Sequence, residues 1–176
     1  MQNELIIIKG HLYDKIEPIL NYIFDEARND LTMKLAYSKF VTDESAEEAF
    51  LSAVRSIESK LQSYYVEWVR YIATELIHNQ VIDEHSSYSE EITKILRSEM
   101  IYGMQTSNVH FSDTQMAQIK EIVPHWEIHA VLSRNPQKRI NSIKSILDDF
   151  KSDCRMAIRR RMDNLFDKIQ NTCSNL

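Results

Sequence analysis

The chain has 176 residues, of which 43% are hydrophobic and 27% charged, with a net charge of −5. This composition is that of an ordinary globular protein and excludes a wholly disordered chain, and the length fits one helical domain spanning residues 1–176. The sequence contains only two glycines and three prolines. Because phosphate-cradling loops need several glycines close together, a P-loop or a dinucleotide-binding fold is excluded.

The N-terminal third predicts a short extended segment followed by helices. The apolar run in residues 4–9 is consistent with a strand or an extended arm. Helical patterns follow over about 12–28 and 31–40, and Pro18 either begins the first of these helices or kinks it. None of these segments approaches the roughly 20 apolar residues of a membrane span.

The most regular segment predicts a long helix over residues 45–82. Its start resembles a capping box at Ser45 and Glu48, and it contains neither glycine nor proline. Its apolar residues recur in steps of three and four as an 11-residue repeat, which indicates a nearly straight, coiled-coil-like helix. They are Ala46, Phe50, Val54, Ile57, Leu61, Tyr65, Trp68, Ile72 and Leu76.

Shorter helices are predicted over about 87–102, where Ser87 and Glu90 offer a capping box, and over 112–122 and 124–132, and a second long helix is predicted over 136–172. The second long helix carries its own apolar stripe, from Ile140 to Ile169. We therefore expect an all-α, elongated helical bundle built on the two long helices, with four to five shorter helices packed along them.

Charge is divided unevenly along the chain. Residues 43–99 hold twelve acidic and five basic side chains, whereas residues 136–176 hold nine basic and five acidic ones. A basic ridge on the second long helix could bind nucleic-acid phosphates, meet an acidic partner protein, or face the acidic part of its own chain. We define this basic ridge as Lys151, Arg155, Arg159, Arg160 and Arg161.

An aromatic cluster on the first long helix is a second candidate surface. Tyrosine, tryptophan and arginine are enriched at the energetic centres of protein interfaces. The alternative is that the aromatic rings pack beneath neighbouring helices. The residues, called the aromatic edge, are Tyr64, Trp68, Arg70 and Tyr71.

The sequence gives weaker indications of a metal site or of a reactive cysteine. Glu75 and His78 have the spacing of a di-iron helix motif, but no second copy of that motif is present. A further set, Glu121, His125 and His129, repeats every four residues, although Pro124 interrupts the turn. Two cysteines without a CxxC pair fit the reduced thiols of a cytoplasmic protein.

These patterns predict a protein without catalytic residues, cofactor or bound metal. The leading function is a non-catalytic helical adaptor or assembly subunit that binds partner proteins or a second copy of itself, as part of a larger complex. The first alternative is a nucleic-acid-associated helical module using the basic ridge, for example in an ATPase or nuclease assembly. The second is a helical-bundle metal-binding protein.

Overall fold

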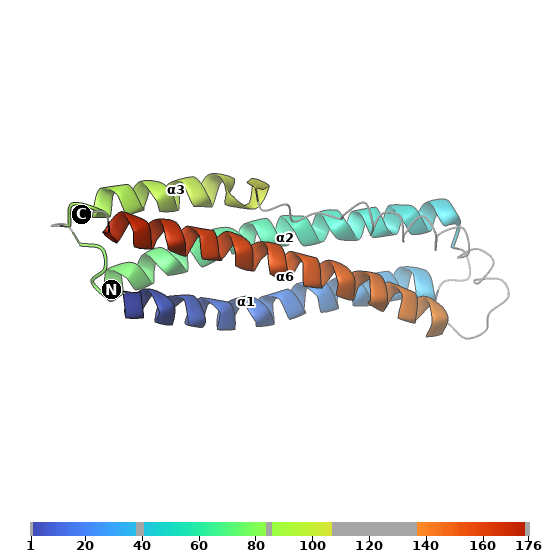
Figure 1. The fold of residues 1–176 in the computed structure, drawn as a ribbon. Coiled ribbons are helices and arrows are strands. Elements are labelled where there is room, and N and C mark those ends of the chain that lie inside the picture. The colour runs from blue at the N-terminus through green and yellow to red at the C-terminus, as the bar shows by residue number, and fades with distance from the viewer. Residues whose placement is uncertain (1, 38–40, 84–85, 107–136, 175–176) are drawn as a thin grey trace. The chain divides into compact units, whose positions relative to one another are not determined.

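The computed structural model describes residues 2–37, 41–83, 86–106 and 137–174. Within these residues the protein is all-α, with four helices packed as a bundle and no strand (Figure 1). The two longest are α2 (Asp43–His78, 36 residues) and α6 (Gln137–Ser174, 38 residues), which confirms both long helices predicted from the sequence. The other two are α1 (Gln2–Leu31) and α3 (Ser89–Thr106).

The expectation of an N-terminal strand or arm over residues 4–9 is wrong. These residues belong to α1, which is continuous from Gln2 to Leu31 with Pro18 inside it and passes directly into a π-helical turn, η1 (Thr32–Ala36). Leu5, Ile8 and Leu12 are buried in steps of three and four, whereas Ile6 and Ile7 are more than half exposed. The run is therefore one turn of an amphipathic helix.

The apolar stripes of the long helices form the core. Every member of the α2 stripe from Ala46 to Leu76 is buried, and on α6 the stripe is buried from Ile143 to Ile169 while Ile140 is half-buried. The apolar residues whose repeat predicts the long helices are thus the residues that face the core. The shorter helices predicted over 112–122 and 124–132 lie outside the described residues.

The chain divides into two compact units. Unit 1 comprises Met1–Ile19, Leu61–Val109 and Arg155–Leu176, and unit 2 comprises Leu20–Lys60 and His110–Cys154. In unit 1 the N-terminal part of α1 and the C-terminal parts of α2 and α6 pack together with α3 (Figure 1). Among its described residues, unit 2 contains the rest of α1 with η1, the N-terminal part of α2 and the N-terminal part of α6.

The ends of α2 have recognisable capping structures. Thr42 and Ser45 form a reciprocal capping box, in which each backbone N–H donates to the other's hydroxyl at 3.0 Å. The box is therefore three residues earlier than the one expected at Ser45 and Glu48. At the other end, the N–H of Val81 donates to the carbonyl of Leu76 and that of Gln80 to Ile77, which is a Schellman motif.

No helix in the described part of the chain combines the length and apolarity needed to cross a bilayer.

Candidate functional site

The aromatic edge lies on α2 in unit 1, and its members differ in exposure. Trp68 is buried at 4% exposure, and the half-buried Tyr64 ring stacks on it with centroids 6.3 Å apart and an interplanar angle of 26°. Stacking on a buried ring restricts the rotamers of the Tyr64 phenol. Trp68 therefore acts as a support, and Tyr64 presents the accessible part of the pair.

Tyr71 lies two helical turns after Tyr64 on α2 and, like Tyr64, is half-buried. The ammonium group of Lys15 from α1 lies 4.9 Å from the centroid of its ring, a cation–π contact. Partial burial, with a smaller effect of the Glu75 charge, raises the pKa of the Tyr71 phenol, so it stays neutral at physiological pH. Arg70 is exposed and pairs with Glu67 at 2.7 Å.

The basic ridge on α6 is largely engaged by other helices of its own chain. In unit 1, Arg155 makes two hydrogen bonds to the Glu17 carboxylate of α1, at 2.9 and 2.5 Å, and this carboxylate raises the pKa of the guanidinium. The Arg159 guanidinium lies 5.1 Å from the ring centroid of Tyr13. In unit 2, Lys151 donates to the side-chain oxygen of Asn21.

The remaining two members of the ridge differ from each other, since among the described residues Arg161 is paired and Arg160 is not. Arg161 makes a two-pronged contact with Glu99 of α3, at 2.6 and 2.8 Å. Arg160 is exposed, and no described residue pairs with it. The ridge is thus four cations that hold neighbouring helices and one that points to solvent, rather than a row of five available cations.

A polar cluster around Tyr13 continues the seam between α1 and α6 in unit 1. Asp163 accepts hydrogen bonds from the hydroxyl of Tyr13 and from the ammonium of Lys9, the latter at 2.5 Å. Partial burial would raise the pKa of the Asp163 carboxyl, but these two donors outweigh it and lower the pKa. Burial and the same carboxylate raise the pKa of Tyr13.

Sequence reasoning missed a buried polar network at the centre of unit 1. Glu99 is 4% exposed and accepts from both Arg161 of α6 and the hydroxyl of Tyr65 of α2, which is fully buried. Burial first, and then the Glu99 carboxylate, raise the pKa of the Tyr65 phenol, which keeps it a hydrogen-bond donor. The partners lie 34 and 62 residues from Glu99, so no local spacing indicates the network.

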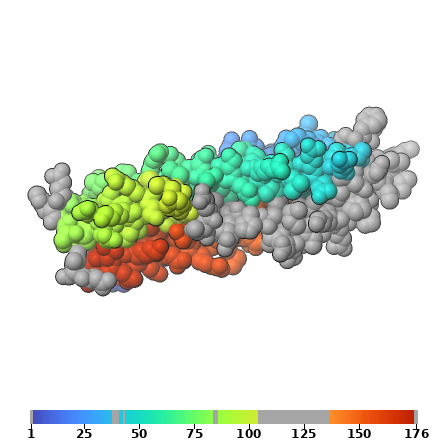
Figure 2. All heavy atoms as spheres, turned by 90° about the horizontal axis from the view of Figure 1, so that it is seen from above, coloured from blue at the N-terminus to red at the C-terminus, as the bar shows by residue number. Residues whose placement is uncertain are grey.

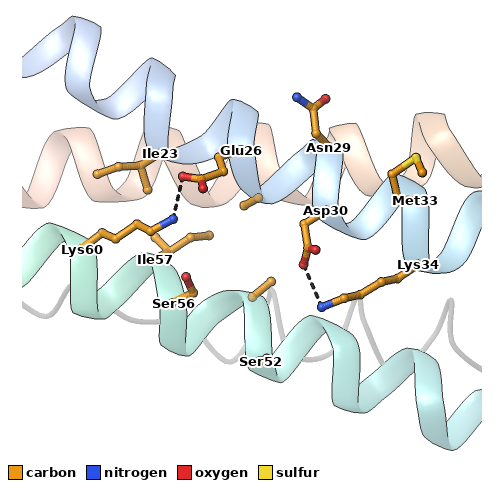
Figure 3. A pocket seen from close by; sticks show the side chains of 12 residues that line it. Ile23, Glu26, Asn29, Asp30, Met33, Lys34, Ser52, Ser56, Ile57 and Lys60 are labelled. Carbon is orange, nitrogen blue, oxygen red and sulfur yellow. Dashed lines mark hydrogen bonds and ion pairs between the residues drawn. The ribbon is translucent and has the colours of Figure 1, made fainter.

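A groove of about 570 Å³ lies between α1 and α2 in unit 2 (Figure 3). Ile23 and Ile57 are buried in it, whereas Met33 is 71% exposed. Its charged side chains neutralise one another, since Lys60 reaches Glu26 at 2.6 Å and Lys34 reaches Asp30 at 2.9 Å. The groove therefore has no excess charge that would select an ionic ligand.

The metal and thiol candidates gain no support from the described residues. No group of three or more His, Cys, Asp or Glu side chains able to hold a metal ion occurs in these residues, which include Glu75 and the exposed His78. The set of Glu121, His125 and His129 falls outside them. Cys154 is buried and Cys173 half-buried, both as free thiols, and burial raises the pKa of each.

Comparison with protein-family models, with curated proteins and with solved structures finds no match for this chain. Function is therefore inferred from the chain's own residues.

Proposed function

We propose that the protein is a non-catalytic helical adaptor or assembly subunit that binds another protein through the aromatic edge of α2. The observation that carries this proposal is the Tyr64–Trp68 stack, because it presents a half-buried phenol already held in place by a buried ring. A preorganised aromatic side chain loses little conformational entropy on binding. Tyrosine next to arginine is also the composition typical of interface hot spots.

The neighbouring contacts support the same use of this surface. Tyr71 lies under the Lys15 ammonium, and Arg70 keeps an exposed guanidinium whose contact with Glu67 is between solvent-exposed side chains. An exposed ion pair of this kind is worth little, so Arg70 can exchange Glu67 for a partner's carboxylate at small cost. Tyr64, Arg70 and Tyr71 are thus the contact residues, and Trp68 positions Tyr64.

The nucleic-acid alternative receives less support from the geometry. Phosphate binding by Arg155 or Arg161 would have to break two-pronged contacts with Glu17 and Glu99. Within the described residues, Arg159 and Arg160 are the exposed members of the ridge, and the Arg159 guanidinium already lies over the Tyr13 ring. One or two phosphate contacts give weak binding, since affinity for nucleic acid grows with the number of phosphates neutralised.

We further propose a cytoplasmic location. Both cysteines are free thiols, with Cys154 buried in the core. A reducing compartment maintains such thiols, whereas secreted proteins of modest size more often use their cysteines in disulfides. A chain recovered from an oxidising compartment would contradict this location.

The test of the adaptor proposal compares proteins retained from a native-cell lysate by three versions of the full chain. Wild type and the control Tyr22→Ala, which removes an exposed tyrosine from α1 in unit 2, should retain the same partner. The double variant Tyr64→Ala/Tyr71→Ala should bind it about 30-fold more weakly, from a hot-spot loss of about 2 kcal/mol. Equal retention by all three versions would contradict the proposal.

Self-association is measured separately, by light scattering coupled to size-exclusion chromatography. If the partner is a second copy, wild type and Tyr22→Ala should elute with the mass of a dimer or higher oligomer. The double variant should then shift to the monomer mass of 20.7 kDa. If the double variant also elutes as an oligomer, the self-association surface is not the aromatic edge.

A further inference from the structure

The buried face of α3 in unit 1 carries two aliphatic side chains, one carboxylate and one glycine. Its buried positions are Ile92, Leu96, Glu99 and Gly103, at steps of four, three and four. Figure 2 shows α3 next to the C-terminal part of α6, with its outer side chains on the surface. Ile101 and Tyr102, on the outer side, are 61% and 55% exposed.

Apolar packing alone defines the axial position of α3 poorly. A shift of one helical turn would move Ile92 to the place of Leu96 and Leu96 to the place of Glu99, so apolar side chains would still face α2 and α6. Such near-equivalent registers arise whenever apolar residues repeat every three or four positions along a helix. The groove therefore needs another feature to select one register.

The Tyr65–Glu99–Arg161 network supplies that feature. Glu99 meets donors from two different helices, with Tyr65 on α2 and Arg161 on α6, and its carboxylate is almost completely buried. A one-turn shift of about 5 Å would separate the carboxylate from both donors. It would leave a buried charge without compensation, which is strongly unfavourable.

Gly103 marks the same register through its close approach to two members of this network, Tyr65 and Glu99. A Cβ atom at this position would lie 2.5 Å from Cε1 of Tyr65 and 2.6 Å from Oε1 of Glu99, closer than van der Waals contact allows. A one-turn shift in one direction would bring Glu99 or Met100 to the place of Gly103, where its Cβ atom would collide with the Tyr65 ring. In the opposite direction the glycine would replace Glu99 opposite Arg161 and leave the guanidinium without its carboxylate.

We infer that Tyr65, Glu99, Arg161 and Gly103 together form a register lock, which selects the single axial position in which α3 docks between α2 and α6. The lock specifies the arrangement of unit 1 rather than supplying most of its stability. In some other helix assemblies a buried polar residue selects the register at a cost in stability. Replacing a buried ion-pair network by apolar residues of similar volume often keeps or raises stability.

The test replaces the network by apolar side chains of similar size in the full chain, as Tyr65→Phe/Glu99→Leu/Arg161→Met. Wild type should show one set of α3 amide signals by NMR, with an NOE between the Gly103 Hα protons and the ring of Tyr65. The triple variant should have an equal or higher urea midpoint. Its α3 amide signals should be doubled or broadened, and the NOE from Gly103 should weaken at least twofold.

The matched control is Glu17→Leu/Arg155→Met, which removes a two-pronged pair of the same kind between α1 and α6. It should leave the α3 signals and the Gly103 NOE unchanged. A triple variant with one set of α3 signals and an intact NOE would overturn the inference, because packing alone would then set the register. A triple variant with a much lower urea midpoint would also overturn it, because the network would then supply stability instead.

Gly103→Ala tests the second marker while leaving the three polar side chains in place. Its methyl group must displace the Tyr65 ring or the Glu99 carboxylate, so the Nε–H signal of Arg161 should shift and the urea midpoint should fall. An unchanged Arg161 signal in a folded variant would show that the close approach at Gly103 does not help to define the register.

Discussion

Gln80 has a left-handed backbone conformation that favours glycine, and it predicts a stabilising substitution. Its φ of 59° makes it the one non-glycine residue with positive φ in the described part of the chain. It occupies the position after the C-cap in the Schellman motif that ends α2, where its N–H donates to Ile77 at 3.0 Å. Val81 and Leu76, which bracket the motif, are both buried, so the turn is held in place.

We expect Gln80→Gly to stabilise the fold by about 0.5–1 kcal/mol. The left-handed conformation costs a residue with a Cβ roughly 1–2 kcal/mol in steric strain. Glycine avoids this strain, but ordering its backbone on folding costs roughly 0.5–1 kcal/mol more than ordering that of alanine. For a chain of this size the gain corresponds to a rise of about 1–4 °C in Tm. The control Gln80→Ala keeps the Cβ and should change stability little.

The assay is urea unfolding followed by far-ultraviolet circular dichroism. Gln80→Gly should move the midpoint upward with an unchanged m value, and Gln80→Ala should remain near wild type. Equal midpoints for the glycine and alanine variants would refute the reasoning, because the two differ at this site in the Cβ atom alone.

Three further substitutions and measurements test other parts of the structure. Thr42→Ala removes one half of the capping box at the start of α2 and should lower the free energy of unfolding by about 1 kcal/mol in the same urea assay. In native protein, a maleimide should label the half-buried Cys173 at least tenfold faster than Cys154, whose burial raises its thiol pKa; equal rates would contradict the packing of α6. The pKa of Asp163 is lower in the folded protein than in the unfolded chain. The carboxylate therefore stabilises the fold at pH values above its unfolded-state pKa of about 4, and this stabilisation is lost as the pH falls through its folded-state pKa. The acid-induced loss of stability should therefore be smaller in Asp163→Asn than in wild type, and identical pH profiles would count against the contact with Lys9.

The long helices could be predicted from the sequence because their signal is redundant. The apolar stripe of α2 keeps an 11-residue repeat from Ala46 to Leu76, over about eight turns, and every residue of the stripe is buried. No competing glycine or proline interrupts either α2 or α6. Local periodicity and tertiary burial therefore agree.

The N-terminal segment could not be assigned in the same way. Four consecutive apolar residues, Leu5–Ile8, satisfy a strand pattern as well as a helix pattern. Leu12 and Ile16, at helical spacing from Ile8, decide in favour of the helix because they extend its buried face. Pro18 does not begin a helix, because α1 continues through it, and a kink at Pro18 stays a prediction.

The polar network shows what local patterns omit. Glu99 stands on the apolar stripe of α3, seven residues after Ile92 and three after Leu96, and this was the available sequence signal. A carboxylate at a core position calls for a buried partner, but Tyr65 and Arg161 are distant in the chain. Arg161 could be recognised as part of a basic ridge, whereas its orientation toward α3 depends on how the helices pack.

The most direct test of the adaptor proposal is site-specific photo-crosslinking in the native cell. A benzophenone amino acid replaces Tyr64 in one version of the chain and the exposed Tyr22 of α1 in another. We predict a defined crosslinked protein, or a crosslinked dimer, from position 64 and none from position 22. No product at position 64, or the same products from both positions, would contradict the claim that the aromatic edge of α2 binds a partner.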